Sequence, residues 1–362
     1  MAKAPETARA AGTDDVILEI DALKCYFKVD DGVVRAVDGV SFKLRRGEIL
    51  GVVGESGSGK SVTQLAMMGL IPMPPGYIAG GKALFEGRDL LQMRPEELRK
   101  MRGNKISMIF QDPMSSLNPF LRISRQLEEV LEIHTSLPKA EREARCIEML
   151  QKVGIPDPAR RYRQYPHQFS GGMRQRVMIA MALLCNPTML IADEPTTALD
   201  VTIQAQILEL IRALRDDFGT SVIMITHDLG VVAGMSDRII VMYAGRVMER
   251  GRTRDLFKEP SHPYTIGLLR SVPRLDEGGA HTTRLIPIPG LPPNTAQELP
   301  GCPFAARCPF TEARCREAFP EPRSYAEGHE VFCWRADEIR AMPNDDRAEA
   351  AVRKAEEMSR AS

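Results

Sequence analysis

Residues 49–61 read Ile-Leu-Gly-Val-Val-Gly-Glu-Ser-Gly-Ser-Gly-Lys-Ser, and this stretch decides the fold. The run 49–53 is apolar and continuous, which is typical of a strand buried on both faces of a parallel sheet. Residues 54–61 fit the pattern G-x-x-x-x-G-K-[ST], in which glycines let successive backbone N–H groups converge on phosphate oxygens. Because the helix-like run 62–70 follows directly, the sequence predicts a strand, a phosphate-binding loop and a helix in that order.

The loop pattern also assigns roles to its polar side chains. Lys60 is expected to neutralise charge on the β- and γ-phosphates, and Ser61 is expected to ligate Mg²⁺. The sequence therefore predicts binding of ATP and Mg²⁺. The residues expected to surround the nucleotide are Gly54, Glu55, Ser56, Gly57, Ser58, Gly59, Lys60 and Ser61.

A second apolar strand, residues 189–192, ends in two carboxylates, Asp193 and Glu194. Open α/β sheets bind ligands at the carboxyl ends of their strands. Asp193 is therefore expected to join the Mg²⁺ site, and Glu194 to orient and polarise the attacking water. The alternative is a strand that simply runs into a solvated acidic turn, and the phosphate loop upstream disfavours it.

Strand-like and helix-like runs alternate along most of the chain, which predicts an α/β fold with parallel strands joined by helices. A mostly helical stretch lies between about residues 94 and 185 and reads as an inserted subdomain. A helix is expected over 201–217, ending near Gly219. The expected strands are 16–20, about 36–44, 49–53, 189–192, 222–226 and 239–243.

Composition limits the classes of protein that fit. The 362 residues carry 48 basic and 48 acidic side chains, and the zero net charge argues against a broad surface for nucleic acid. No apolar run approaches the roughly 20 residues that span a bilayer. Residues 1–15 lack the apolar core of a secretory signal and are expected to form a flexible tail. Seven cysteines, an odd number without a signal peptide, favour a reducing compartment.

Residues 169–176, Phe-Ser-Gly-Gly-Met-Arg-Gln-Arg, open a predicted helix whose free N–H groups suit a phosphate. They resemble the signature motif of ABC ATPases and lie just upstream of the Asp193–Glu194 strand, as in that family. Met173 stands where the family usually has Gln. The resemblance implies that the motif contacts the γ-phosphate held by an opposite subunit, through Ser170, Gly171 and Gly172.

Further positions match the same family. Gln111 resembles the glutamine that senses Mg²⁺ or water and signals to the membrane subunit, and His227 resembles the histidine that touches the γ-phosphate. The resemblance thus implies catalytic roles for Glu194, His227 and Gln111. Asp200 lies in a stretch that resembles the loop crossing the dimer interface. Phe27 is the preferred aromatic for stacking on adenine, with Tyr26 as the competing choice.

Three stretches narrow the resemblance to the dipeptide/oligopeptide importer branch: residues 111–119, 173–178 and 262–269. The cysteine-bearing tail is similar to that branch as well. The likeness covers residues from about 16 to 335. It implies an ABC-type P-loop ATPase with a parallel core sheet, an antiparallel β part near the N-terminus, an inserted helical subdomain and a small, irregular C-terminal domain with four cysteines. The implied divisions are 1–15, 16–272, 273–335 and a charged tail at 336–362.

The implied function is that of the ATP-binding subunit of an importer, hydrolysing ATP to drive uptake of dipeptides or oligopeptides from a peripheral position on the cytoplasmic face of the cell (inner) membrane. The implied partners are a second ABC ATPase, usually a different but related chain, two membrane permeases and an extracytoplasmic binding protein. Nickel, glutathione or another small solute remains an alternative cargo. A soluble ABC ATPase acting on ribosomes or DNA is disfavoured, because the chain has neither a second cassette nor a coiled-coil insertion. A catalytically dead regulatory cassette is disfavoured by the intact Lys60, Asp193, Glu194 and His227.

Four cysteines gather near the end of the chain, at Cys302, Cys308, Cys315 and Cys333. Structural zinc sites usually contain closely spaced cysteine pairs, which are absent here, whereas iron–sulfur clusters need four thiolates and tolerate varied spacing. A [4Fe–4S] cluster is therefore the preferred interpretation, with zinc as the alternative and unligated or disulfide-paired cysteines as a third. His329 could replace one cysteine as a ligand.

Overall fold

The computed structural model describes residues 15–111, 116–197, 199–271, 288–326, 328–343 and 347. In this part of the chain, the main sheet has strands in the order β11-β12-β10-β9-β3-β8-β7-β6. The members from β9 to β6 are parallel to one another, and β10, β12 and β11 extend the sheet as antiparallel strands. Their bounds are β3 Ile49–Val53, β6 Ile106–Ile109, β7 Met189–Asp193, β8 Ser221–Thr226, β9 Arg238–Tyr243, β10 Arg246–Arg252, β11 Arg323–Ala326 and β12 His329–Val331.

A second, antiparallel sheet has the order β2-β1-β4-β5. Its strands β1 and β2 are long and pair along most of their length, with bulges that bend them. Apolar side chains from this sheet and from one face of the main sheet form a common core around Leu23, Phe42, Val52 and Ile225. The bounds are β1 Val16–Val29, β2 Gly32–Arg45, β4 Gly76–Phe85 and β5 Arg88–Asp89.

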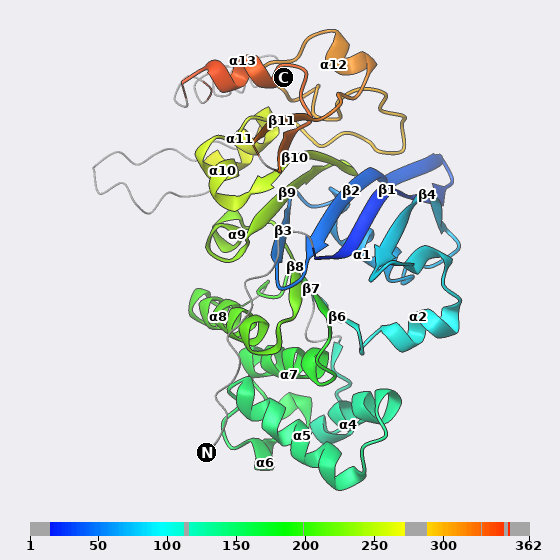
Figure 1. Cartoon of the computed structure of the whole chain (residues 1–362), viewed down its shortest axis with the longest axis vertical. Coiled ribbons are helices and arrows are strands. Elements are labelled where there is room, and N and C mark those ends of the chain that lie inside the picture. Colours follow the sequence, from blue (N-terminus) through cyan, green and yellow to red (C-terminus); the bar gives the residue numbers. More distant parts are fainter. Residues whose placement is uncertain are drawn as a thin grey trace, which may run out of the picture.

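Helices surround the two sheets, and Figure 1 shows that α4 to α7 form a bundle at one end of the molecule while α12 and α13 lie at the other. The bundle packs its own apolar core against the main sheet. The α-helices are α1 Lys60–Met67, α2 Pro95–Met101, α4 Ile123–His134, α5 Lys139–Lys152, α6 Pro158–Arg161, α7 Gly171–Leu183, α8 Val201–Phe218, α9 Leu229–Met235, α10 Thr253–Lys258, α11 Pro263–Arg270, α12 Arg314–Glu317 and α13 Ala336–Ala341. Short 3₁₀ turns occupy Leu90–Gln92 and Pro166–Gln168.

The structure differs from the expected helical subdomain of 94–185, because this stretch contains β6, which pairs with β7 in the main sheet. The strand has only four residues, Ile-Ser-Met-Ile, and follows α2 closely. Because four residues are too few to show the alternation of a strand, its hydrophobic pattern could not be distinguished from that of the neighbouring helices. The helical bundle proper therefore begins after β6. Five further strands also lie outside the expected set: β4, β5, β10, β11 and β12.

The C-terminal region is less irregular and less separate than expected. Its strand β12 pairs with β10, so the region extends the main sheet. The buried carboxylate of Glu249 on β10 accepts hydrogen bonds from the backbone N–H groups of Ser261 and His262 and lies 2.8 Å from Nε2 of His329. The start of the expected charged tail is helix α13, which buries Ala336 and Ile339. Residues 1–14 of the expected N-terminal tail, which was placed at 1–15, and most of the segment after 343 lie outside the described residues.

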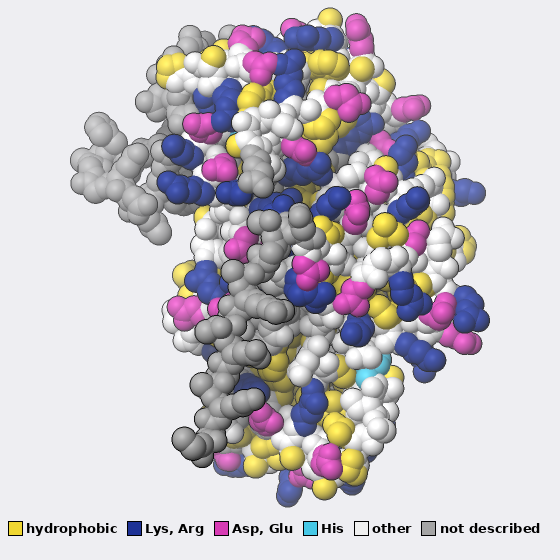
Figure 2. All heavy atoms as spheres, viewed as in Figure 1, with side chains coloured by type: hydrophobic (Ala, Val, Ile, Leu, Met, Phe, Trp, Pro, Cys, Tyr) yellow, Lys and Arg dark blue, Asp and Glu magenta, His cyan; other side chains and the backbone are white. Residues whose placement is uncertain are grey.

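Basic and acidic side chains are interspersed over the described part of the face drawn in Figure 2, as equal numbers of the two predict. Among the described helices, none is both long and apolar enough to cross a bilayer.

Candidate active site

The parallel order of β3, β8, β7 and β6 brings the ends of these strands to one edge of the main sheet, which we call the carboxyl edge. The phosphate loop, residues 54–61, leaves β3 at this edge. Gln111 follows β6, Asp193 ends β7, and His227 follows β8. Sheet topology alone therefore gathers the motifs that lie far apart in the sequence.

Two glycines hold the phosphate loop against its neighbours. Gly54 has a φ of +153°, and a Cβ there would lie 2.1 Å from the carbonyl oxygen of Met242 on β9. Gly59 has a φ of +95°, and its Cβ would lie 2.4 Å from the carbonyl oxygen of Ala36 on β2. Both positions require glycine, because any side chain would push the loop away from the two sheets.

The ammonium group of Lys60 lies inside the phosphate loop and is buried. Its Nζ donates hydrogen bonds to the carbonyl oxygens of Gly54 at 2.8 Å and Glu55 at 3.0 Å, and to Oγ of Ser58 at 3.4 Å. Burial lowers the pKa of Lys60, while carboxylates at the carboxyl edge oppose that shift. The geometry thus puts a cation at the centre of a loop suited to phosphate.

Ser61 and Asp193 are adjacent, with Oγ of Ser61 donating to Oδ1 of Asp193 at 2.9 Å. Burial raises the pKa of Asp193, and the hydrogen bond from Ser61 opposes that effect. Hydroxyl and carboxylate oxygens are ligands that Mg²⁺ accepts, usually together with waters and substrate phosphates. The donor set at this position therefore fits the expected magnesium site.

Glu194 is the point where three expected catalytic residues meet. Its Oε2 accepts hydrogen bonds from Nε2 of Gln111 at 3.1 Å and from Oγ1 of Thr197 at 2.9 Å. Its Oε1 lies 3.3 Å from Nδ1 of His227. The backbone of Glu194 has a φ of +46°, an uncommon conformation that turns its side chain into this cluster. The sequence did not single out Thr197, although it follows Glu194 within the same turn.

The signature residues open helix α7, where Oγ of Ser170 accepts a hydrogen bond from the backbone N–H of Met173 at 3.3 Å. Ser170 and Gly171 are exposed to solvent. A Cβ on Gly172 would lie 2.8 Å from the side chain of Ile203, so α7 packs closely on α8. These residues open the last helix of the helical bundle, whereas the phosphate loop leads into α1 beside the sheets (Figure 1).

Gln175, which the sequence did not single out, ties the signature helix to the carboxyl edge. Its buried Nε2 donates to the carbonyl oxygen of Pro195 at 2.6 Å. Pro195 directly follows Glu194. The only sequence signal for this contact is that Gln175 belongs to the signature stretch itself.

Asp200 caps helix α8, because its Oδ1 accepts a hydrogen bond from the backbone N–H of Ile203 at 3.0 Å. The next residue, Val201, is 82% exposed, so the start of α8 offers an apolar side chain to solvent. Ala198, in the same expected interface loop, lies outside the described residues.

Both candidate adenine-stacking residues are half-buried on β1. The hydroxyl of Tyr26 donates to Oδ1 of Asp38 at 2.7 Å, and its ring meets Tyr77 edge to face. Phe27 packs against the core between the two sheets. Tyr26 is thus held by a polar partner, and Phe27 stays the prediction for the adenine contact.

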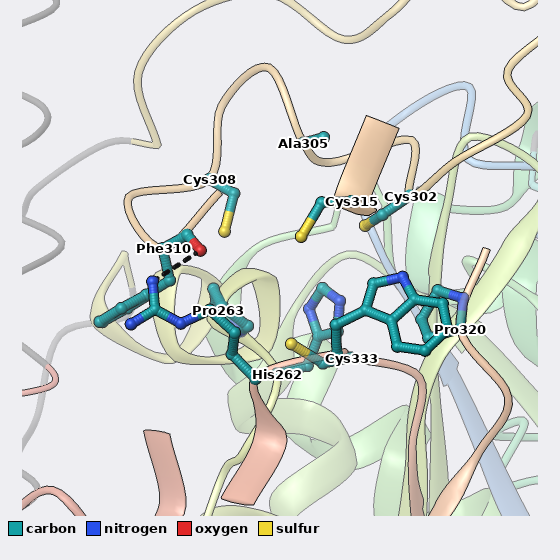
Figure 3. A pocket seen from close by; sticks show the side chains of 11 residues that line it. His262, Pro263, Cys302, Ala305, Cys308, Phe310, Cys315, Pro320 and Cys333 are labelled. Carbon is teal, nitrogen blue, oxygen red and sulfur yellow. Dashed lines mark hydrogen bonds between the residues drawn. The ribbon is translucent and has the colours of Figure 1, made fainter. Parts of the chain in front are cut away.

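The four cysteines of the C-terminal region line one small cavity of about 20 Å³, the thiol cavity. Figure 3 shows the sulfur atoms of Cys302, Cys308 and Cys315 on one side and that of Cys333 facing them. None of the four forms a disulfide. The four cysteines that lie close together in the sequence therefore also lie close together in the structure.

The four thiols are not arranged around a common point where a metal ion could bind. In the described part of the chain, no group of three or more His, Cys, Asp or Glu side chains is arranged to hold a metal ion. Burial raises the pKa of Cys302 to about 12 and that of Cys333 to about 11, which keeps both thiols neutral. His329, the other suggested ligand, is instead paired with Glu249.

Comparison with protein-family models identifies two regions. Residues 37–197 match the model described as ABC transporter. Residues 248–315 match the model described as oligopeptide/dipeptide transporter, C-terminal region. The second match begins within β10 and ends within α12.

Curated proteins match over nearly the whole chain. The oligopeptide transport ATP-binding protein OppD of Salmonella typhimurium is 53% identical over 331 residues, which are 91% of this chain and 97% of that protein. The dipeptide transport ATP-binding protein DppD of Bacillus subtilis is 52% identical over 336 residues, 93% of this chain and 97% of its own length.

Solved structures match the ATPase part. The dimeric structure of MJ0796, a bacterial ABC transporter cassette, has a TM-score of 0.59 at 29% identity and covers 66% of this chain and 99% of its own. CbiO1 of Clostridium perfringens has a TM-score of 0.58 at 28% identity, covering 68% of this chain and 92% of its own. These matches confirm the expected fold. The chain belongs to the ABC transporter ATP-binding proteins, within their oligopeptide/dipeptide branch.

Proposed function

We propose that this chain binds and hydrolyses ATP to drive the import of dipeptides or oligopeptides. The observation that carries the ATPase part is the cluster at Glu194, where Gln111 and His227 meet beside the Ser61–Asp193 pair. The match of residues 248–315 to the oligopeptide/dipeptide C-terminal region, together with the names of the relatives, supports peptides as the cargo.

The residues divide the reaction among them. Backbone N–H groups of the phosphate loop and the ammonium of Lys60 bind the phosphates, and Phe27 stacks on adenine. Ser61, Asp193 and Gln111 hold Mg²⁺, which neutralises charge on the phosphate oxygens when bound. Glu194 accepts the proton of the attacking water. His227, 3.3 Å from Glu194, holds the γ-phosphate in line.

We infer that hydrolysis needs a second ABC ATPase. Ser170 and Gly171 are exposed at the start of α7, and they belong to the helical bundle instead of the phosphate loop's own surroundings. They therefore act on the nucleotide of a partner, and Asp200 lies at the contact between the two. We propose that a related chain supplies the opposite signature, that two permeases carry the peptide, and that an extracytoplasmic protein delivers it. The complex sits on the cytoplasmic face of the cell membrane.

The test is uptake by proteoliposomes that contain the permeases, both ATPases and ATP on the ATPase side. Radiolabelled di- and oligopeptides, presented with the binding protein, should accumulate only with hydrolysable ATP. A matched complex carrying Glu194→Gln in this chain serves as the control. Accumulation of nickel or glutathione but not of peptide would move the proposal to another cargo, and ATP hydrolysis without any vesicle-associated cargo would overturn import.

We further propose that the thiol cavity holds a [4Fe–4S] cluster, with zinc as the alternative. Four thiols that line one cavity and form no disulfide are the donor set such a cluster uses. The sulfurs must draw together and lose their protons on loading, because they are not arranged around a metal ion as they stand. Such a centre would cross-link the loop that follows Gly301 to the chain after β12.

Iron, sulfide and zinc should be quantified in protein purified without oxygen, alongside its visible absorbance. The cluster predicts brown protein with equal molar iron and sulfide, lost in Cys308→Ser but kept in Cys146→Ser, whose thiol is buried in the helical bundle instead. Colourless protein with stoichiometric zinc selects the alternative. Protein free of both metals after such handling contradicts a metal centre.

A further inference from the structure

A guanidinium group from the C-terminal region reaches into the phosphate loop. Arg307 lies between Cys302 and Cys308, yet its side chain forms a two-pronged ion pair with Glu55 of the loop. Nη1 donates to Oε2 of Glu55 at 2.6 Å, and Nη2 donates to Oε1 at 3.0 Å. The two residues are 252 positions apart, so this is a contact between distant parts of the chain.

Every N–H of the Arg307 guanidinium has an acceptor. Besides the two bonds to Glu55, Nε donates to the carbonyl oxygen of Pro289, Nη2 to that of Ile288, and Nη1 to the hydroxyl of Tyr243. Only 5% of the side chain is exposed. A fork-shaped cation with all its donors used is held in one orientation, which a more flexible lysine could not reproduce.

Aromatic packing fixes the same side chain from the other side. The guanidinium lies over the rings of Tyr243 and Phe304, at 5.6 and 5.9 Å from their centres. Both rings belong to the core that joins β9 to the C-terminal region. The position of Arg307 is therefore set by the sheet and by its own region together.

Glu55 is held by its backbone as well as by its carboxylate. Its N–H donates to the hydroxyl of Tyr264 on α11 at 2.9 Å, and its carbonyl oxygen accepts from Nζ of Lys60. The carboxylate is close enough to influence Lys60 electrostatically. Without a partner, a negative charge here would repel incoming phosphates and compete for Lys60.

We propose that Arg307 is a positioning residue for the ATP site: it neutralises Glu55 and fixes the first turn of the phosphate loop, so that part of the affinity for ATP is set by the C-terminal region. Loss of the guanidinium would leave the half-buried carboxylate of Glu55 uncompensated beside the phosphates. Loss of both charges would remove the repulsion, because no orphaned carboxylate remains.

The test compares Arg307→Gln, Glu55→Gln and the double variant in the assembled transporter. Arg307→Gln should raise the KM for ATP, and the Kd for a fluorescent ATP analogue, about tenfold or more, with a smaller change in kcat. Glu55→Gln should change KM far less. The double variant should return towards the wild-type KM, a rescue that a purely structural role does not produce.

The matched control is Arg238→Gln. Arg238 pairs with buried Glu48 at 3.1 Å, at the opposite end of β3 from the phosphate loop. This variant should lower thermal stability and leave the KM for ATP unchanged, which separates loss of a buried ion pair from loss of loop positioning.

If Arg307→Gln does not assemble, Arg307→Lys tests the same idea, since it keeps the charge and loses the fork. The KM of Arg307→Lys for ATP should lie between the wild-type value and the roughly tenfold higher value expected when Glu55 has no partner. A wild-type KM in every Arg307 variant that assembles, or a double variant whose KM is as high as that of Arg307→Gln, overturns the proposal. Either outcome leaves peptide import untouched, because uptake at saturating ATP measures that function separately.

Discussion

The carboxyl edge and the thiol cavity both gather reactive side chains from distant stretches of the chain, but they differ in what holds those side chains. At the carboxyl edge, regular strands place Gln111, Asp193 and His227, and each side chain already meets another member of the site or lies beside one. In the thiol cavity, loops and the short helix α12 supply the sulfurs, which face one another without a ligand arrangement. Strand order alone brings the side chains of the carboxyl edge together, whereas the proposed metal would be needed to draw the thiols into a ligand arrangement.

Arg307 connects the two regions. Its backbone belongs to the loop that carries Cys302 and Cys308, and its side chain pairs with Glu55 of the phosphate loop. Substitutions confined to one region at a time therefore test whether the carboxyl edge and the thiol cavity act separately.

The largest expected effect is at the carboxyl edge. Glu194→Gln keeps the hydrogen-bonding shape of the side chain but removes the base, and should lower ATP turnover by about 10²–10⁴-fold while ATP still binds. Steady-state phosphate release and binding of a fluorescent ATP analogue measure the two properties. The control is Glu209→Gln, an equal change on the exposed face of α8. Turnover within twofold of wild type, with the partner's site also disabled, would remove Glu194 from its assigned role.

In the thiol cavity, Cys333→Ser should abolish stoichiometric metal and lower the melting temperature, since Cys333 alone comes from the chain after β12. ATP turnover of the assembled complex should fall far less than in Glu194→Gln. Metal analysis and calorimetry on the same preparation provide the measurement. An equal loss of turnover in both variants would show that the two regions are not separable.

A smaller effect is expected where the signature helix meets the carboxyl edge. Gln175→Met leaves the carbonyl oxygen of Pro195 without its buried donor, which should cost about 1–3 kcal/mol of unfolding free energy. Gln204→Met is the control, because Gln204 is only half-buried and its Nε2 donates to Oγ1 of Thr196 in the same turn. Chemical denaturation of the isolated chain compares the two, and equal losses would contradict a special role for the Gln175 contact.

The smallest effect concerns Asp38, which accepts hydrogen bonds from Tyr26 and from Arg246 at 2.7 Å each. Burial alone would raise the pKa of Asp38, but these hydrogen bonds outweigh it and the pKa is lowered. The stabilisation is therefore fully present above the unfolded pKa of about 3.9 and is lost as the pH falls through the folded value.

Asp38→Asn should accordingly cost about 1–2 kcal/mol at neutral pH and show a shallower decline in stability below about pH 4. Denaturant titrations at a series of pH values test this. A variant whose stability falls as steeply as that of wild type in acid would exclude Asp38 as a source of the decline.

A strand could be predicted from the sequence wherever a motif marked both the strand and the residues that follow its carboxyl end. Residues 49–61 did so for β3 and α1, and the run ending in Asp193 did so for β7. The short strand β6 was hidden, because four residues among helices carry no readable period. The strands β11 and β12 were hidden for another reason: both are short, and they become strands because β12 pairs with β10 and β11 pairs with β12.

The site followed the same rule. Residues at strand ends were placed by the sheet, so Glu194 and His227 could be assigned to the same ATP site in advance through the family pattern. Thr197 and Gln175 were missed because their roles come from packing across a turn and between helices. Arg307 was missed because nothing local marks an arginine whose partner lies 252 residues away.

The central claim is that this chain holds ATP at its carboxyl edge but needs a partner's signature helix to hydrolyse it. The most direct measurement is the ATP turnover rate of the isolated chain at a concentration where it is monomeric, compared with its rate in the assembled transporter. We predict tight binding with little turnover alone, and full turnover in the complex that is lost when the partner's signature serine is replaced. Full turnover by the monomer would contradict the account.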